Sequence, residues 1–146
     1  MDSGGEYELE SPDRLAVTTT MGNEFSPTDL VIQLDSSPVF SGSGETDIIY
    51  QEGSTNLSEN VIGVTWCNDA VGDGIRCDQQ YIRIRGNGTY DTSVACHETG
   101  HAVGLVHGDG ANPRLGNEDS RLGCMIKDGW NNDLGSNNTG NINKVY

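Results

Sequence analysis

The apolar residues of this chain fall into short groups separated by turn-forming residues, and these groups predict a few short elements. Ser11 followed by Pro12 is a helix start, because serine caps a helix and proline fits its first turn. A helix is therefore expected from Ser11 to about Phe25, although the threonines within it are poor helix formers. Short runs rich in β-branched and aromatic residues predict strands at residues 30–34, 46–50, 61–66 and 80–85.

The second half of the chain is predicted to contain one well-defined helix and much irregular structure. Asp91 can cap a helix over residues 92–103. Beyond Gly104 the sequence is dominated by Gly, Asn and Asp, with a further short helix expected near residues 139–145. No internal repeat is visible. We expect residues 1–146 to form a single domain whose acidic, glycine-containing first ten residues are loose.

The composition predicts a small hydrophobic core and argues against some classes of binding partner. Only 34% of the residues are hydrophobic and 20 are glycine, which favours a loop-rich fold over a helical bundle. The 8 basic and 22 acidic residues give a net charge of −14, which argues against a nucleic-acid or membrane partner and is interpreted as a solubilising surface. No apolar run reaches the length of a membrane span. Residues 1–6 lack the features of a signal peptide, so a mature fragment with a starter methionine is expected.

The chain has 4 cysteines, an even number, in a small loop-rich sequence. No Cys-x-x-Cys pair is present, so disulfides are favoured over metal ligation, and disulfides imply export to an oxidising compartment. Cys67 and Cys77 flank a turn-rich loop between two predicted strands, where a bridge would fit the base of a hairpin.

The candidate chemistry lies in the second predicted helix and just after it. His97 and His101 are four residues apart, so on a helix their side chains differ by about 40° in direction and about 6 Å in height. This spacing allows two imidazoles to bind one metal ion. Glu98 points about 100° away from His97, where it can take a proton from water at the metal without being a ligand.

A third ligand requires the chain to turn back, because a residue on the same helical face would line up with the first two. Gly104 permits the positive φ of such a turn, and His107 follows three residues later. Three neutral nitrogens plus water describe a catalytic zinc site, whereas a fourth protein ligand would make the site structural. The alternative is that these are ordinary helix histidines. The chain has only 3 histidines and all stand at ligand spacing, which favours the zinc site.

From Cys96 to Met125 the sequence resembles the metzincin clan of metalloproteases, whose motif has three histidines and a glutamate at this spacing. The run Gly123-Cys124-Met125-Ile126 is similar to the second signature of the clan, a methionine in a tight turn that forms the floor of the zinc site without binding the metal. The chain looks most like small matrixin-like secreted proteases, which pair a cysteine just before the zinc helix with one before the methionine turn. The resemblance thus implies a disulfide between Cys96 and Cys124.

The resemblance also implies a fold and a function. The fold is α+β in two unequal lobes, with a twisted mixed sheet, an active-site helix and a small irregular C-terminal lobe. In that clan an antiparallel edge strand binds the substrate, and residues 61–66 are the candidate here, with a plain structural strand as the alternative. The implied function is that of a secreted, monomeric zinc endopeptidase acting on peptides or proteins, with an inhibitory segment upstream. His97, His101 and His107 would be the ligands and Glu98 the general base.

Some positions depart from the pattern of the clan or leave a choice open. Lys127 stands where some members have a tyrosine ligand, so no such ligand is expected, and Gly108 after the third histidine matches no subfamily. Asp109 is a rival for the third ligand, since aspartate replaces histidine in one bacterial branch. Trp130 is expected either to shape the specificity pocket or to pack in the core. Calcium is a further candidate cofactor, although solvated turn residues are favoured for the aspartates that would bind it: Asp69, Asp73, Asp109 and Asp119.

Two other functions compete with the protease. A catalytically inactive binding module would keep the metzincin fold, but it has no chemical need for Glu98. A structural zinc or calcium protein would need a fourth protein ligand, and no further histidine exists to provide one.

Overall fold

In the computed structural model, which describes residues 7–72, 76–86 and 88–146, the strands follow one another in the middle of the chain and helices lie before and after them. In chain order the elements are α1 (Ser11–Thr20), the π-helical segment η1 (Met21–Phe25), β1 (Ile48–Glu52), β2 (Gly63–Val71), β3 (Arg76–Ile84), α2 (Thr92–Ala102), the 3-10 segment η2 (Ser120–Met125) and α3 (Ser136–Val145). The predicted α+β class is confirmed. All three predicted helices are present, within a few residues of their expected bounds.

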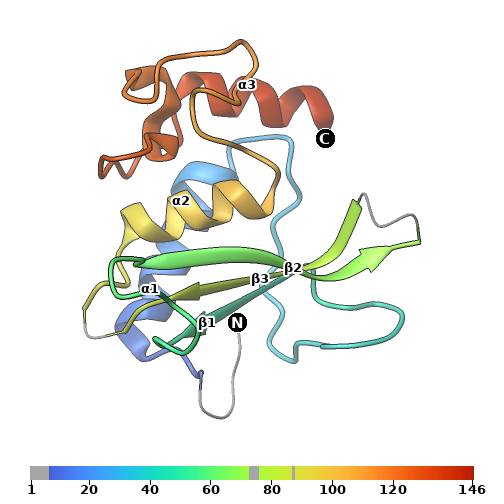
Figure 1. Cartoon of the computed structure of the whole chain (residues 1–146). Helices are drawn as coiled ribbons and strands as arrows, with labels where there is room; N and C mark the ends of the chain where they lie inside the picture. Colours follow the sequence, from blue (N-terminus) through green and yellow to red (C-terminus); the bar gives the residue numbers. More distant parts are fainter. Residues whose placement is uncertain (1–6, 73–75, 87) are drawn as a thin grey trace.

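The sheet is small and mixed, as expected. Its strand order is β1-β3-β2, with β1 parallel and β2 antiparallel to β3 (Figure 1). The strand predicted at residues 61–66 therefore forms, as β2, at an edge of the sheet. Both β2 and β3 run further into the predicted loop than the sequence indicated, and the disulfide between Cys67 and Cys77 joins them there. This confirms the first predicted bridge.

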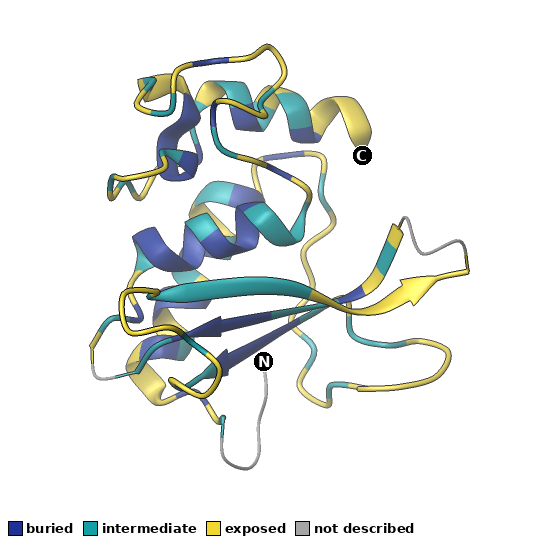
Figure 2. Ribbon diagram, viewed as in Figure 1, coloured by how far each residue is buried: buried dark blue, intermediate teal, exposed yellow. Residues whose placement is uncertain are grey.

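Helix α2 lies between the sheet and the C-terminal part of the chain (Figure 1). It has buried residues along most of its length, as the dark blue of Figure 2 shows. One hydrophobic cluster joins α2 to α1 and the sheet, and its buried members include Val17, Tyr50, Ile82, Ile84 and Val94. A second cluster covers α2 from the C-terminal side, and its buried members include Phe25, Cys96, Leu122, Met125 and Ile142. Helix α2 is thus fixed from two sides.

The start of α2 is set by a local cap that the sequence predicts. The carboxylate of Asp91 accepts hydrogen bonds from the backbone N–H groups of Ser93 and Val94, at 2.9 and 3.0 Å. These are two of the N–H groups that a helix leaves without an internal partner. The cap therefore fixes the point from which the positions of the later helical residues are counted.

The strand predicted at residues 30–34 is wrong. No strand forms there, and Val31 is 94% exposed. Ile32 and Leu34 are exposed as well. The physical reason is pairing: a strand needs a neighbour for its backbone N–H and C=O groups, and in the described part of the chain β1 pairs with β3 alone. β-branched composition without such a neighbour leaves an irregular segment.

The N-terminal segment is fixed over part of the range that was expected to be loose. Residues 1–6 lie outside the described residues, but Leu9 is only 1% exposed and belongs to the first hydrophobic cluster. The guanidinium of Arg83 lies 4.0 Å from the centre of the Tyr7 ring, a distance typical of a cation–π contact. Across the described ranges, no helix combines the length and the apolar character that crossing a bilayer requires.

Candidate metal centre

Three histidines converge at the end of α2, as their spacing predicts. His97 and His101 come from successive turns of the helix, and His107 comes from the segment that follows it. Each offers one ligand atom, and these atoms lie within 4.8 Å of one another. The Nε2 atom of His97 is 3.2 Å from the Nε2 atoms of both His101 and His107.

The turn that brings His107 to the other two depends on Gly104. Its φ is +88°, a left-handed conformation that residues with a Cβ seldom adopt. The N–H of Gly104 donates to the carbonyl of His101 at 3.0 Å, and the N–H of Leu105 donates to the carbonyl of Gly100 at 2.8 Å. These bonds end the helix and reverse the chain. The predicted role of Gly104 is confirmed.

Hydrogen bonds on the far side of two rings fix their tautomers. The Nδ1 atom of His97 lies 2.7 Å from the carbonyl oxygen of Cys124, and the Nδ1 atom of His101 lies 3.0 Å from that of Leu105. A carbonyl oxygen can only accept, so each Nδ1 carries the hydrogen. In a neutral ring the Nε2 atom is then an unprotonated ligand, the state that metal binding requires.

The spacing of the ligand nitrogens fits a zinc ion. Tetrahedral zinc with Zn–N bonds of 2.0–2.1 Å would place its nitrogens about 3.3 Å apart. The two Nε2 separations of 3.2 Å around His97 agree with this distance. Lone pairs that face each other this closely repel unless a cation or a proton lies between them. Three imidazoles are also a donor set that zinc favours.

Burial keeps two of these rings neutral at physiological pH. It lowers the pKa of His97 to about 4, with the neighbouring His101 and His107 adding to the effect against the Cys124 hydrogen bond. Burial also lowers the pKa of His107, assisted by His101 and Lys127. A metal ion therefore does not have to displace protons from these rings at neutral pH.

Glu98 is buried and its carboxylate is directed toward the sheet. Its Oε2 atom accepts a hydrogen bond of 2.8 Å from the hydroxyl of Thr65 on β2. Burial raises the pKa of this carboxyl group, opposed by the Thr65 hydrogen bond. The carboxylate is not part of the three-histidine cluster, as expected of a general base rather than a ligand.

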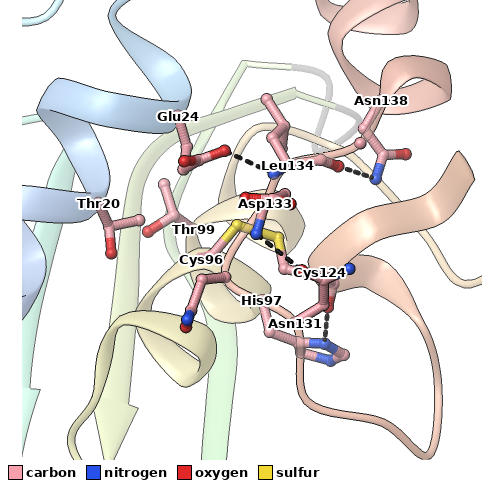
Figure 3. The surroundings of a disulfide bond; sticks show 12 residues. Thr20, Glu24, Cys96, His97, Thr99, Cys124, Asn131, Asp133, Leu134 and Asn138 are labelled. Atoms are coloured by element: carbon pink, nitrogen blue, oxygen red, sulfur yellow. Dashed lines mark hydrogen bonds between the residues drawn. A yellow bond between two sulfur atoms is a disulfide. The ribbon is translucent and has the colours of Figure 1, made fainter. Parts of the chain in front are cut away.

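The disulfide between Cys96 and Cys124 lies close to His97 (Figure 3). It joins α2 to η2, and this confirms the second predicted bridge. The carbonyl of Cys124 accepts the His97 hydrogen bond, while its N–H donates to the carbonyl of Asp133 at 2.7 Å. Met125 is fully buried under the helix, and a Cβ at Gly100 would overlap its sulfur. Met125 thus packs beneath α2 close to the histidines.

The sequence did not predict two residues that hold the segment after Met125 in place. The buried amide of Asn138 on α3 donates to the carbonyls of Leu122 and Leu134, at 2.6 and 2.8 Å. The carboxylate of Glu24 accepts from the N–H of Leu134 at 2.7 Å (Figure 3). These bonds hold the segment after Met125 against α3 and η1. Nothing in the local sequence marks either residue, because their partners are distant along the chain.

Other candidate residues are not part of the three-histidine cluster. Asp109, the rival third ligand, is exposed and accepts from the amide of Asn117 at 2.8 Å. The carboxylate of Asp119 pairs with Arg121, and this pairing lowers its pKa to about 2. Among the described residues, no group of three or more acidic side chains converges as a calcium site would require; Asp73 lies outside those residues. Trp130 is 65% exposed, so it does not pack in the core.

Comparisons of the chain with protein-family models, with curated proteins and with solved structures find no match. The site must therefore be interpreted from its own residues.

Proposed function

We propose that this protein is a zinc-dependent endopeptidase in which His97, His101 and His107 hold the metal and Glu98 is the general base. The observation that carries the proposal is the convergence of the three histidines, with the Nε2 atom of His97 at 3.2 Å from both others. Glu98 follows the first ligand directly and is held outside the ligand set. This combination is typical of catalytic rather than structural zinc sites.

The chemistry divides between the metal and the protein. The three imidazoles would hold a zinc ion, which would supply Lewis-acid activation of a water molecule and of the scissile carbonyl group. Glu98 accepts a proton from the attacking water on a carboxylate oxygen, and then delivers this proton to the departing amine.

A metzincin-like fold of the matrixin-like kind is part of the proposal. Met125 beneath α2, the Cys96–Cys124 bridge and the antiparallel edge position of β2 all support it. In such a fold an extended peptide substrate would pair with the free edge of β2. Trp130 beyond Met125 would border the specificity pocket, in keeping with its exposure.

The proposed location is extracellular, and the proposed partner is a peptide or protein substrate of a monomeric enzyme. Two disulfides that use all 4 cysteines support export, since such bonds persist in oxidising compartments. The net charge of −14 supports a soluble surface without affinity for nucleic acid or anionic lipid.

The alternative is a binding module that keeps the metal site without catalysis. Casein cleavage by the purified chain separates the two functions when it is measured with zinc, with a chelator, and after zinc is restored. A protease loses cleavage with the chelator and regains it with zinc. Glu98→Gln should bind zinc and cleave nothing, while Glu118→Gln, which alters an exposed carboxylate, should match the unaltered protein. Zinc-loaded protein that leaves casein and peptides intact would support the binding module instead.

A further inference from the structure

The carboxylate of Glu98 lies against strand β2, where Thr65 forms a hydrogen bond to it and Gly63 leaves space for it. The hydroxyl oxygen of Thr65 lies 2.8 Å from Oε2 of Glu98 and 2.9 Å from the main-chain carbonyl oxygen of the same residue. A hydroxyl has one hydrogen to donate, so it serves one of these acceptors at a time. Both contacts restrict Thr65 to the immediate surroundings of the carboxylate.

Gly63 provides the space in which the carboxylate lies. A Cβ at this position would be 2.6 Å from Oε1 of Glu98, and 2.8 and 2.9 Å from its Cγ and Cδ atoms. These separations are shorter than a real Cβ contact allows. The backbone of Gly63 is not in the left-handed region, so conformational freedom does not explain the glycine. The close approach of Glu98 does.

The two oxygens of the carboxylate are consequently in different situations. Oε2 is engaged by Thr65, whereas no hydrogen bond joins Oε1 to another of the described residues. Oε1 lies in the space that a side chain at position 63 would fill. A side chain at position 63 would therefore displace the oxygen that Thr65 does not engage.

We propose that Thr65 and Gly63 are positioning residues for the general base: Thr65 fixes the rotation of the Glu98 carboxylate through Oε2, and Gly63 leaves the space that Oε1 occupies. The inference rests on the proposed peptidase function. It assigns to the edge strand β2 a role in the proton transfer itself, separate from any pairing with substrate. The alternative is a structural role, in which Thr65 only joins β2 to α2 through the Glu98 carbonyl. The experiment distinguishes the positioning role from the structural one.

The test compares kcat, KM, zinc content and thermal unfolding for Thr65→Val, Thr65→Ser and Gly63→Ala. Thr65→Val keeps the shape of the side chain but removes the hydroxyl, and it should lower kcat about 10- to 100-fold with KM unchanged, since a misplaced catalytic group costs up to about 100-fold. Thr65→Ser restores the hydroxyl and should recover most of kcat. Gly63→Ala should lower kcat while the Thr65 hydroxyl is intact. Thr28→Val is the control: it removes another hydroxyl bonded to a main-chain carbonyl, far along the chain from Glu98.

Several outcomes would overturn the inference. One is equal loss of kcat in Thr65→Val and Thr65→Ser, and another is a loss that follows zinc content or unfolding temperature across the variants, because a structural tie alone would behave in this way. If Thr65→Val does not fold, Gly63→Ala decides, and an unchanged kcat in that folded variant would contradict the proposal. Failure of the proposed function gives a different result from failure of the inference. If the proposed function is wrong, Glu98→Gln would cleave as fast as the unaltered chain. If Glu98→Gln is inactive and Thr65→Val is fully active, the inference is wrong and the proposed function stands.

Discussion

The Nδ1 atom of His97 lies 2.7 Å from the carbonyl oxygen of Cys124, whose sulfur is bonded to Cys96, the residue just before His97. The disulfide and the hydrogen bond therefore connect the same two short segments, α2 and η2. The bridge holds the carbonyl in place, and the carbonyl holds the ring with its Nε2 atom toward the other histidines. The stability of the fold and the arrangement of the three histidines are therefore linked at this point.

Removal of that bridge should weaken both properties. Cys96→Ala with Cys124→Ala should lower the free energy of unfolding by about 3 to 4 kcal/mol on loop-entropy grounds. It should also weaken zinc binding about 10- to 100-fold, because the hydrogen-bond partner of a ligand is no longer fixed. Denaturant unfolding and competition with a zinc chelator measure the two effects. Cys67→Ala with Cys77→Ala is the matched control, since it should cost stability but leave zinc affinity unchanged. Equal zinc affinity in the two double variants would contradict the link.

The proposed assignment of His107 as the third ligand predicts a contrast between His107 and Asp109. His107→Ala should weaken zinc binding by more than the about 100-fold that loss of an outer partner costs. Asp109→Ala should leave zinc binding unchanged, because the Asp109 carboxylate lies with Asn117 instead. Isothermal titration of the metal-free variants with zinc makes the comparison. A larger loss in Asp109→Ala than in His107→Ala would reverse the assignment.

Met125 should contribute to stability without contributing a ligand. Its side chain is fully buried, so Met125→Ala should cost about 2 to 5 kcal/mol in the free energy of unfolding. Met125→Leu conserves volume and should cost less than about 1.5 kcal/mol. Both folded variants should still bind one zinc ion, as measured by atomic absorption. A folded Met125→Leu protein that cannot retain zinc would show that the sulfur does more than pack.

The pH dependence of stability should include a contribution from Glu52 at the end of β1. Burial raises the pKa of this carboxyl group, and the adjacent Asp13 raises it further. A raised pKa means that the folded state binds the proton more tightly, so stability is lost as the pH rises through the pKa of the folded state. Glu52→Gln should therefore raise the unfolding temperature at pH 7 and have less effect at pH 4. Glu118→Gln, an exposed control, should show no such difference. A destabilised Glu52→Gln protein at pH 7 would contradict this interpretation.

The sequence predicts the convergence of the three histidines because the determinants of that arrangement are local. The cap at Asp91, the helical spacing of His97 and His101, and the turn at Gly104 all lie within one continuous segment. Local rules are sufficient for such a segment, since every position is counted from the same helix start. The Cys67–Cys77 pairing was predictable for a similar reason, as the two residues flank one hairpin.

Features that depend on distant segments were not predictable. Thr65 contacts Glu98 across a sequence separation of 33 residues, and the contact exists only because β2 packs against α2. The apolar residues 30–34 have strand composition, but whether they form a strand depends on a neighbour that composition does not reveal. Nothing in the sequence around Gly63 indicates that the Glu98 carboxylate lies where a side chain at position 63 would be.

A titration of the metal-free protein with zinc, in which the cleavage rate of a peptide is followed, measures whether zinc bound by these three histidines makes the chain a peptidase. We expect no cleavage without metal, a cleavage rate that rises in proportion to added zinc, and a plateau at one equivalent of zinc. Under the same titration, His107→Ala should stay inactive at one equivalent. Cleavage that does not depend on zinc would contradict the proposed function, and so would fully zinc-loaded protein that does not cleave the peptide.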